Sequence, residues 1–280
     1  MLAQVTAFRL QWAGVGVVLL VLVGWWLRRA ALPLLVVVVA SLALLVPRVS
    51  SDVPTAAPAV ELRVYSANVR YDTADPDLLA RSVAERGADV VALPEASRRY
   101  ADDLVTRLPG YLVGGGSDVP YSSASTALLV RSGLQPEFTD GPAGLSNSTV
   151  GARVHVGGRE VLVAAVHPDA PVPGSEATWR ADLAALRPPC AASTPTVLLG
   201  DLNATLDHSG LRALLGAGCT DAGERTGGGL AGTWPQSAPR ALGAVIDHVL
   251  VAGGVVARTY EVLDDPGSDH RALSVTLDVG

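Results

Sequence analysis

Four apolar, strand-like segments of this 280-residue chain each end at a polar side chain of a catalytic type. One of these segments, Thr196–Leu199, is followed by Gly200 and then by Asp201 and Asn203. A turn explains one such ending, since Gly, Asp and Asn are common turn residues. The other three segments end at Asn68, Glu95 and His167. Four such endings in one chain are hard to explain by turns alone. The pattern predicts four strands that end at a shared edge.

Two later segments show the opposite polarity. Asp247 comes before the apolar run Val249–Val251, and Asp269 and His270 come before Ala272–Leu277. These strands must run antiparallel to the early ones if all the polar groups are to meet at one edge. The sequence therefore predicts mixed sheets, and it argues against a TIM barrel, whose site lies at the C-terminal ends of all its strands.

The strand-like segments alternate with helical ones, which indicates an α/β fold. Asp75, Pro76 and Asp77 open a helix with an N-cap acid and a proline in the first turn, and Gly87 ends it. Further helices are expected over Ser97–Leu108, Ser175–Leu186 and Ser209–Leu215. Besides Thr196–Leu199, strands are expected over Glu61–Ser66, Asp89–Leu93, Thr126–Arg131, Thr149–Val156, Glu160–Val166, Val245–Val251, Val255–Leu263 and Arg271–Asp278.

The N-terminal region contains two charge-free apolar segments, Leu10–Leu27 and Ala30–Val46. Their lengths lie near the lower limit for a transmembrane helix, and both exceed the apolar core of a signal peptide. The turn Arg28-Arg29 favours the cytoplasmic side, so the rest of the chain is expected outside. The sequence predicts a multi-pass cell-membrane anchor over 1–47, a Pro/Ala/Ser linker over 48–59 and an extracytoplasmic domain over 60–280.

Composition excludes several classes of function. All 21 basic residues are Arg, and without Lys there is no Walker-type phosphate loop, Schiff-base enzyme or Ser-Lys nucleophile. From Val49 onward, 27 acids face 17 arginines, and the net charge of −10 is opposite to that of proteins that grip long DNA. Cys190 and Cys219 fit no metal motif; outside the membrane they could form a disulfide, or they could be two separate buried thiols.

The polar residues at the strand ends restrict the chemistry. Glu95 with Asn68 and nearby acids offers oxygen ligands of the kind that Mg²⁺ prefers. Asp247 or Asp269 could orient His270 as an acid or base. Because no side-chain nucleophile stands out, water is the expected attacker, and the set suits hydrolysis of a phosphate ester.

The other three histidines are not expected in the site. His155 and His208 lie outside the strand-end pattern, so we expect them at the surface. His248 is expected to point away from the site, because side chains alternate along a strand and Asp247 points toward it.

Six short motifs in one order give the chain a resemblance to the endonuclease/exonuclease/phosphatase superfamily, which includes DNase I-like nucleases, neutral sphingomyelinases and inositol-phosphate phosphatases. The chain resembles a membrane-anchored, bacterial-type member. The motifs are SANVR, LPEAS, VAAVHPDAP, GDLNAT, IDHVLV and GSDHRAL, within Glu61–Asp278. Pro94 departs from the pattern, since many members have Gln there.

The resemblance implies a four-layer α/β sandwich of two packed mixed sheets flanked by helices, with the site at one rim. Glu95 would bind Mg²⁺, or Mn²⁺ in its place, helped by Asn68 and Asp269. The remaining roles concern the substrate and the water: Asp201 and Asn203 would position the water and a phosphoryl oxygen, His270 paired with Asp247 would activate water or stabilise developing charge, and His167 would contact the phosphate or protonate the leaving group.

The leading interpretation is a membrane-anchored, Mg²⁺-dependent phosphodiesterase, with its N-terminal hairpin in the lipid bilayer and no protein partner. The negative domain favours a small phosphodiester, a phospholipid headgroup or a nucleotide. An extracytoplasmic nuclease acting on DNA or RNA is the alternative. A non-catalytic binding module on the same fold is disfavoured, since such a module would be expected to lose some of these polar residues.

Overall fold

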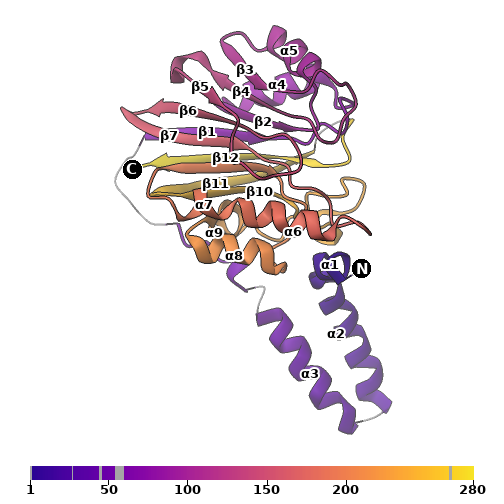
Figure 1. Ribbon diagram of the computed structural model, residues 1–280. Coiled ribbons are helices and arrows are strands. Elements are labelled where there is room, and N and C mark those ends of the chain that lie inside the picture. Colours follow the sequence, from indigo (N-terminus) through magenta and orange to yellow (C-terminus); the bar gives the residue numbers. More distant parts are fainter. Residues whose placement is uncertain (1, 27, 44–45, 54–59, 265–266) are drawn as a thin grey trace.

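The computed structural model describes residues 2–26, 28–43, 46–53, 60–264 and 267–280. Two six-stranded sheets pack against each other, one in the order β11-β12-β1-β2-β4-β3 and the other in the order β5-β6-β7-β8-β10-β9 (Figure 1). The strands are β1 (Val60–Ser66), β2 (Val90–Pro94), β3 (Tyr111–Gly115), β4 (Thr126–Arg131), β5 (Glu137–Thr139), β6 (Val150–Val156), β7 (Arg159–Ala165), β8 (Thr196–Asp201), β9 (Thr220–Asp221), β10 (Asp247–Ala252), β11 (Val255–Asp264) and β12 (Arg271–Val279).

Helices precede and flank the sheets. They are α1 (Leu2–Ala7), α2 (Arg9–Trp26), α3 (Arg28–Ala43), α4 (Pro76–Arg86), α5 (Arg98–Arg107), α6 (Glu176–Ala185), α7 (Arg187–Ala191), α8 (Ser209–Ala217) and α9 (Ala222–Thr226), with short 3₁₀ turns at Val46–Arg48, Ser132–Leu134 and Arg240–Leu242. The expected caps of α4 are present: the Asp75 carboxylate accepts from the N–H groups of Asp77 and Leu78, and Gly87 adopts a left-handed φ of 60°.

Both sheets are mixed, as the sequence predicts. β1 runs parallel to β2 and antiparallel to β12, while β8 runs parallel to β7 and antiparallel to β10. Asp247 at the start of β10 pairs with Asp201 at the end of β8. This arrangement brings the ends of the early strands and the starts of the late strands to one edge.

Three apolar clusters hold the layers together. The first lies between the sheets and includes Leu62 and Val64 of one sheet with Val161 and Val197 of the other. The second packs α4 and α5 on the outer face of the first sheet, and the third packs α6, α7 and α8 on the outer face of the second. The result is the predicted sandwich of two mixed sheets with helices on the outside.

All the strands and helices predicted for the sandwich are present. The sequence analysis missed β3, β5, β9 and the short helices α1, α7 and α9. It left the pairing of Cys190 and Cys219 open, and the structure joins them in a disulfide with Cα atoms 4.8 Å apart. The predicted linker over 48–59 lies partly, at 54–59, outside the described residues.

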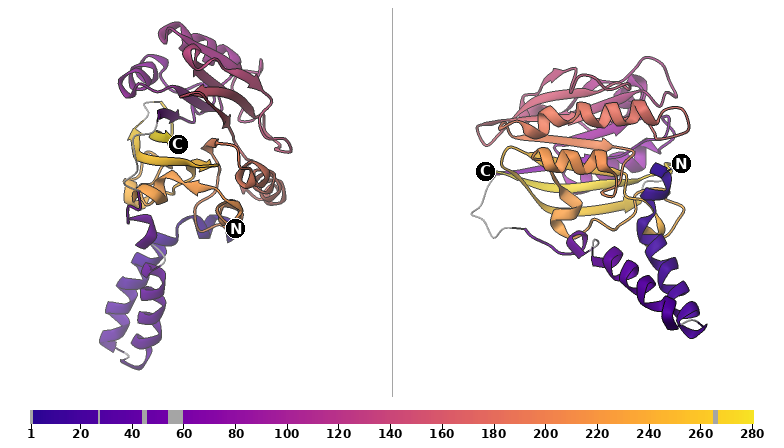
Figure 2. Two further views of the ribbon diagram at one scale, coloured as in Figure 1. Left: turned by 90° about the vertical axis from the view of Figure 1, so that its left-hand side faces the viewer. Right: turned by 60° about the horizontal axis from the view of Figure 1, so that its bottom comes forward.

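Helices α2 and α3 form a hairpin that projects from the sandwich (Figure 2). Their 18 and 16 residues give lengths of about 27 and 24 Å, against a bilayer core of about 30 Å. Among the residues that the structure describes, no helix has both the length and the apolar character needed to cross a membrane. The structure thus shows a helical hairpin where two transmembrane spans were expected, and it does not support the spans.

Candidate active site

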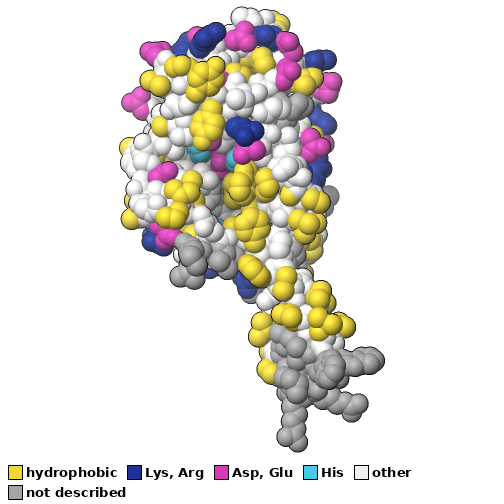
Figure 3. Space-filling model, turned by 90° about the vertical axis from the view of Figure 1, so that its right-hand side faces the viewer, with side chains coloured by type: hydrophobic (Ala, Val, Ile, Leu, Met, Phe, Trp, Pro, Cys, Tyr) yellow, Lys and Arg dark blue, Asp and Glu magenta, His cyan; other side chains and the backbone are white. Residues whose placement is uncertain are grey.

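The predicted site residues meet at the edge where the early strands end and the late strands begin. Figure 3 shows this face, where His and acidic side chains lie in a hollow. The hollow is part of a pocket of about 400 Å³. The residues that reach it from the strand ends include Glu95 after β2, His167 after β7, Asp201 in β8, and Asp269 and His270 before β12.

The backbone near these residues adopts conformations that few side chains tolerate. Glu95 and Asn203 have φ values of 63° and 50°, in the left-handed region. Gly200 has a φ of 149°, and a Cβ atom there would lie 2.0 Å from the carbonyl oxygen of Val166. Only glycine therefore lets β8 pass close to the segment before His167 and end with Asp201 in the site. Strained backbone of this kind is common at functional sites.

Asn68 links two buried carboxylates. Its Nδ2 donates to Oε1 of Glu95 at 3.0 Å and to Oδ2 of Asp201 at 3.2 Å. Its Oδ1 accepts from the backbone N–H of Arg70 at 2.9 Å, which fixes the orientation of the amide. Asn68 thus acts as a hydrogen-bond donor here, and its predicted role as a metal ligand stays a prediction.

His270 and Asp247 form the predicted pair. Nδ1 of His270 lies 3.0 Å from Oδ2 of Asp247, and both side chains are buried. Burial alone would lower the pKa of His270, but the charges of Asp247 and Asp201 outweigh it and raise the pKa to about 10. The imidazole is then a cation at neutral pH, suited to stabilise negative charge. Its Nε2 lies 3.6 Å from Oδ2 of Asp201.

Asp201 is surrounded by charged groups as well as by protein. Burial raises its pKa above the ordinary value and the charge of Asp247 adds to this, while His270 and His167 act in the opposite direction. Oδ1 of Asp201 accepts the backbone N–H of Asn203 at 2.8 Å, while Oδ2 accepts from Asn68 and is the oxygen that lies nearest His270 and His167.

His167 and Asn203 lie on the same side of the site. Nε2 of His167 lies 3.7 Å from Oδ2 of Asp201 and 4.0 Å from Oε1 of Glu95. Nδ2 of Asn203 is 3.4 Å from the same His167 nitrogen. Nδ1 of His167 is buried and has no hydrogen-bond partner among the described residues.

The donor atoms fit a divalent cation. Oε2 of Glu95 is buried without a hydrogen-bond partner in the described part of the chain, which is the environment a cation ligand needs. Donor atoms of Asp201, Asp247 and His270 also lie within 4.8 Å of one another. The buried Oε2 of Glu95, which has no partner among the described residues, makes that carboxylate a candidate ligand, and the set of Asp201, Asp247 and His270 is a second candidate position for an ion.

Asp269 is placed at the rim rather than on the floor of the pocket. Its side chain is 40% exposed, accepts a hydrogen bond from Nε1 of Trp234 at 3.2 Å and lies 3.6 Å from Nε of Arg70. Its predicted role as a ligand stays a prediction.

The pocket contains residues that sequence reasoning missed. Tyr71 and Trp234 line it, and so do four residues at the N-terminus, Ala3, Gln4, Ala7 and Phe8. The charge of Glu95, followed by burial, raises the pKa of Tyr71 above its ordinary value. Tyr71 follows the strand-end residue Asn68 by only three positions, and this proximity could have predicted that it lies near the site. The N-terminal residues belong to no strand-end pattern.

Two of the three predictions for the remaining histidines are confirmed. His155 is exposed, and His248 binds Oδ2 of Asp221 at 2.7 Å, away from the pocket. The expectation that His208 lies at the surface is wrong, because its side chain is buried. Its Nδ1 accepts the N–H of Thr205 at 2.8 Å, and its Nε2 lies 2.7 Å from the carbonyl oxygen of Ala3.

The sequence profile of the Endonuclease/Exonuclease/phosphatase family matches residues 65–270. No curated protein matches the sequence of this chain. Among solved structures, an endonuclease/exonuclease/phosphatase family protein from Bacteroides thetaiotaomicron superposes with a TM-score of 0.63 at 19% identity, covering 80% of this chain and 100% of that protein.

Two further solved structures share the fold. TDP2 from D. rerio, complexed with a single-strand DNA product, superposes with a TM-score of 0.63 at 19% identity, over 78% of this chain and 99% of that one. A mannosyl-6-phosphatase from Bacteroides thetaiotaomicron gives a TM-score of 0.60 at 19% identity, over 78% and 100%.

Proposed function

Because this chain belongs to the Endonuclease/Exonuclease/phosphatase family, we propose that it hydrolyses phosphate esters as a metal-dependent phosphodiesterase, with water attacking phosphorus. The observation that carries the proposal is the buried group formed by Asp201, the His270–Asp247 pair and Glu95. Hydrolysis of a phosphate ester needs a positive charge, a carboxylate that can accept a proton and an oxygen ligand for a metal ion. His270, Asp201 and Glu95 are the side chains proposed for these three roles.

The position of each side chain in the site suggests its role in hydrolysis. The Oδ2 side of Asp201 holds the attacking water and accepts its proton, while the His270 cation stabilises the charge that develops on the phosphoryl oxygens. Asp247 keeps the imidazole of His270 oriented and charged. Asn203 and His167 donate to the phosphate or to the leaving oxygen.

Glu95 would hold the metal, with Asn68 fixing the position of its carboxylate. A divalent cation bound there would polarise the phosphoryl oxygens and neutralise part of their charge. Mg²⁺ is the proposed ion, since the available ligands are oxygens, and Mn²⁺ is the alternative.

A nuclease is the second candidate. TDP2, which shares the fold, was crystallised with a single-strand DNA product, so the fold accommodates nucleic acid in that protein. The net charge of −10 after Val49 favours a small phosphodiester or a phospholipid headgroup over long DNA in this chain.

The proposed location is a membrane surface outside the cytoplasm. Among the side chains of α2 and α3 that the structure describes, thirteen large apolar ones are exposed, seven on α2 and six on α3. An apolar surface that covers several faces of a hairpin is typical of insertion into lipid. The Cys190–Cys219 disulfide supports an oxidising compartment.

The test measures hydrolysis of bis-p-nitrophenyl phosphate by the full chain over a range of Mg²⁺ concentrations, with EDTA in parallel. We expect activity that EDTA abolishes and Mg²⁺ restores. Glu95→Gln should shift the Mg²⁺ concentration for half-maximal rate upward, and excess Mg²⁺ should restore part of the rate. The matched control is Glu61→Gln, an exposed acid on β1. A rate insensitive to EDTA, or equal Mg²⁺ curves for Glu95→Gln and the wild type, would rule out the proposal.

A further inference from the structure

Helix α1 and Phe8 lie in the wall of the catalytic pocket. Ala3, Gln4, Ala7 and Phe8 line the same 400 Å³ space as Asp201. The family profile matches residues 65–270, so this part of the wall comes from outside the region that the family shares. The segment can therefore give this chain a substrate preference of its own.

A histidine holds α1 in place. Nδ1 of His208 accepts the N–H of Thr205, so its Nε2 carries the proton and donates it to the carbonyl oxygen of Ala3 at 2.7 Å. Trp179 packs edge-on against the His208 ring, with centroids 5.1 Å apart. These contacts fix α1 to the loop that follows β8, seven residues after the catalytic carboxylate Asp201.

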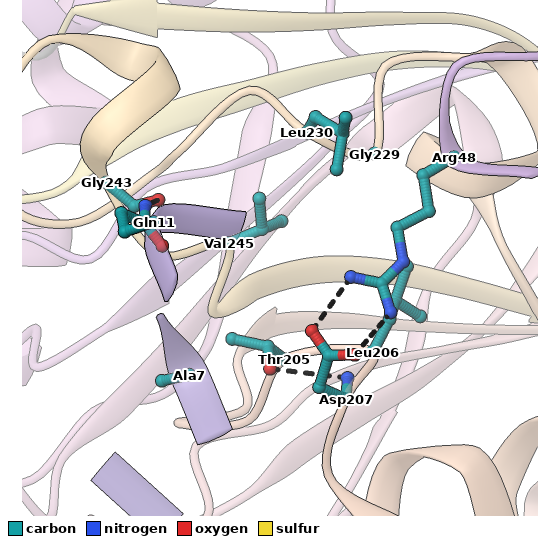
Figure 4. Close-up of a pocket in the computed structure, with 10 residues that line it drawn as sticks. All are labelled: Ala7, Gln11, Arg48, Thr205, Leu206, Asp207, Gly229, Leu230, Gly243 and Val245. Carbon is teal, nitrogen blue, oxygen red and sulfur yellow. Dashed lines mark hydrogen bonds and ion pairs between the residues drawn. The ribbon is translucent and has the colours of Figure 1, made fainter. Parts of the chain in front are cut away.

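The base of the hairpin is held at the same loop. Nη1 of Arg9, the first residue of α2, lies 2.9 Å from Oδ1 of Asp207. Arg48, after α3, donates to both oxygens of Asp207 at 2.8 and 3.0 Å (Figure 4). Gln11 adds a hydrogen bond to the carbonyl oxygen of Gly243 at 3.3 Å. Both ends of the hairpin are thus tied to one buried carboxylate, and only a small cavity of about 30 Å³ is left between them. We call these contacts the Asp207 latch.

The pocket wall formed by α1 and Phe8 is largely apolar, and it lies in the same pocket as the polar residues Asp201 and His270. Ala3, Ala7 and Phe8 face a space whose other apolar lining residues include Val172 and Ile246. A phosphate held at Asp201 and His270 would place one of its ester groups against this lining. A polar ester group would lose hydration there without gaining hydrogen bonds, whereas an apolar one would gain free energy from burial.

We propose that α1 and Phe8 select phosphodiesters with an apolar ester group, by burying that group against the pocket wall. The inference rests on the proposed phosphodiesterase activity and names its substrate class. The apolar hairpin that begins one residue after Phe8 joins this wall to the proposed lipid surface, where amphiphilic esters are found.

The test uses alkyl p-nitrophenyl phosphodiesters with methyl, butyl and hexyl chains and measures kcat/KM for the full-length protein. In the wild type, kcat/KM should rise with chain length, by up to about fourfold per buried methylene. Phe8→Asp should flatten this rise, because it should lower kcat/KM for the hexyl ester by a larger factor than for the methyl ester. Gln4→Leu, at an exposed position of the same wall, should make the rise steeper.

Trp12→Asp is the matched control. Trp12 is exposed, lies one helical turn after Phe8 and does not line the pocket, so its removal should leave the chain-length dependence intact. The inference is overturned if the wild type shows no chain-length dependence, if Phe8→Asp does not alter it, or if Phe8→Asp accelerates all three esters equally, as removal of a plug would. If even the methyl ester is not hydrolysed, the proposed function fails, and the inference fails with it.

Discussion

At the scale of single residues, the site depends on a positive charge carried by the protonated imidazole of His270. His270 is buried, yet Asp247 at 3.0 Å and Asp201 at 3.6 Å keep it protonated. Without Asp247 the imidazole would lose both its orientation and much of its charge. Two residues that act through one pair should therefore show effects that do not add.

His270→Ala and Asp247→Asn should each lower kcat by ~10²–10³-fold, the usual cost of removing one group that stabilises charge in the transition state. The double variant should be little slower than either single one. The measurement is kcat for bis-p-nitrophenyl phosphate in all four proteins. His155→Ala, at an exposed histidine on β6, should keep full activity. Losses that multiply in the double variant would contradict the pairing.

At the scale of elements, the Asp207 latch ties the N-terminal helices to the loop after β8. Burial would raise the pKa of Asp207, but the hydrogen bonds and charges of Arg48 and Arg9 outweigh it and hold the pKa below the ordinary value. A lowered pKa in the folded state means that the latch stabilises the protein above the unfolded pKa, about 4, and weakens as the pH falls through the folded value.

Asp207→Asn should therefore lower the free energy of unfolding at pH 7, by about 3–5 kcal/mol if Arg48 stays buried without its partner. The difference from the wild type should shrink as the pH falls below about 4. Denaturant unfolding of the full chain at several pH values measures this. Asp102→Asn, which breaks an exposed pair with Arg98, should cost less than about 1 kcal/mol. A pH-independent cost at Asp207 would contradict the account.

The sandwich could be predicted from the sequence because its signals are local. Apolar strands, the caps of α4 and the opposite polarity of Asp247 and His270 determine the strands, their directions and the shared edge. The short strand β5 has only three residues, too few for a periodic pattern. The buried state of His208 depends on Ala3, 205 residues away, and no local pattern contains that contact.

The contacts of the metal-binding residues and of the N-terminal helices could not be predicted from local sequence patterns either. The position of Glu95 directly after β2 predicts that it lies in the site. The hydrogen bonds from Asn68 to two carboxylates depend on side-chain orientation, which the sequence pattern does not determine. The two apolar segments are predicted as transmembrane helices; the structure has helices there and does not support the spans. Their docking through Arg9 and Arg48 onto Asp207 is a tertiary contact between residues 159 or more positions apart.

At the scale of the whole molecule, the hairpin should bind lipid. We expect the full chain to float with phospholipid vesicles in a density gradient, because the exposed side chains of α2 and α3 lose contact with water there. The double variant Val18→Asp, Leu22→Asp should stay at the bottom, since it places two charges on an exposed face of α2. Val119→Asp, at an exposed apolar residue of the sandwich, should still float. Flotation of the α2 variant as efficiently as the wild type would contradict membrane insertion of the hairpin.

The central claim is that Asp201 directs water onto phosphorus. Hydrolysis of bis-p-nitrophenyl phosphate in ¹⁸O-labelled water tests it most directly, with mass spectrometry of both products. The account predicts that the label enters the phosphate monoester and not p-nitrophenol, and that Asp201→Asn slows this labelling by ~10²–10⁴-fold. Label in p-nitrophenol, or an Asp201→Asn variant as fast as the wild type, would contradict it.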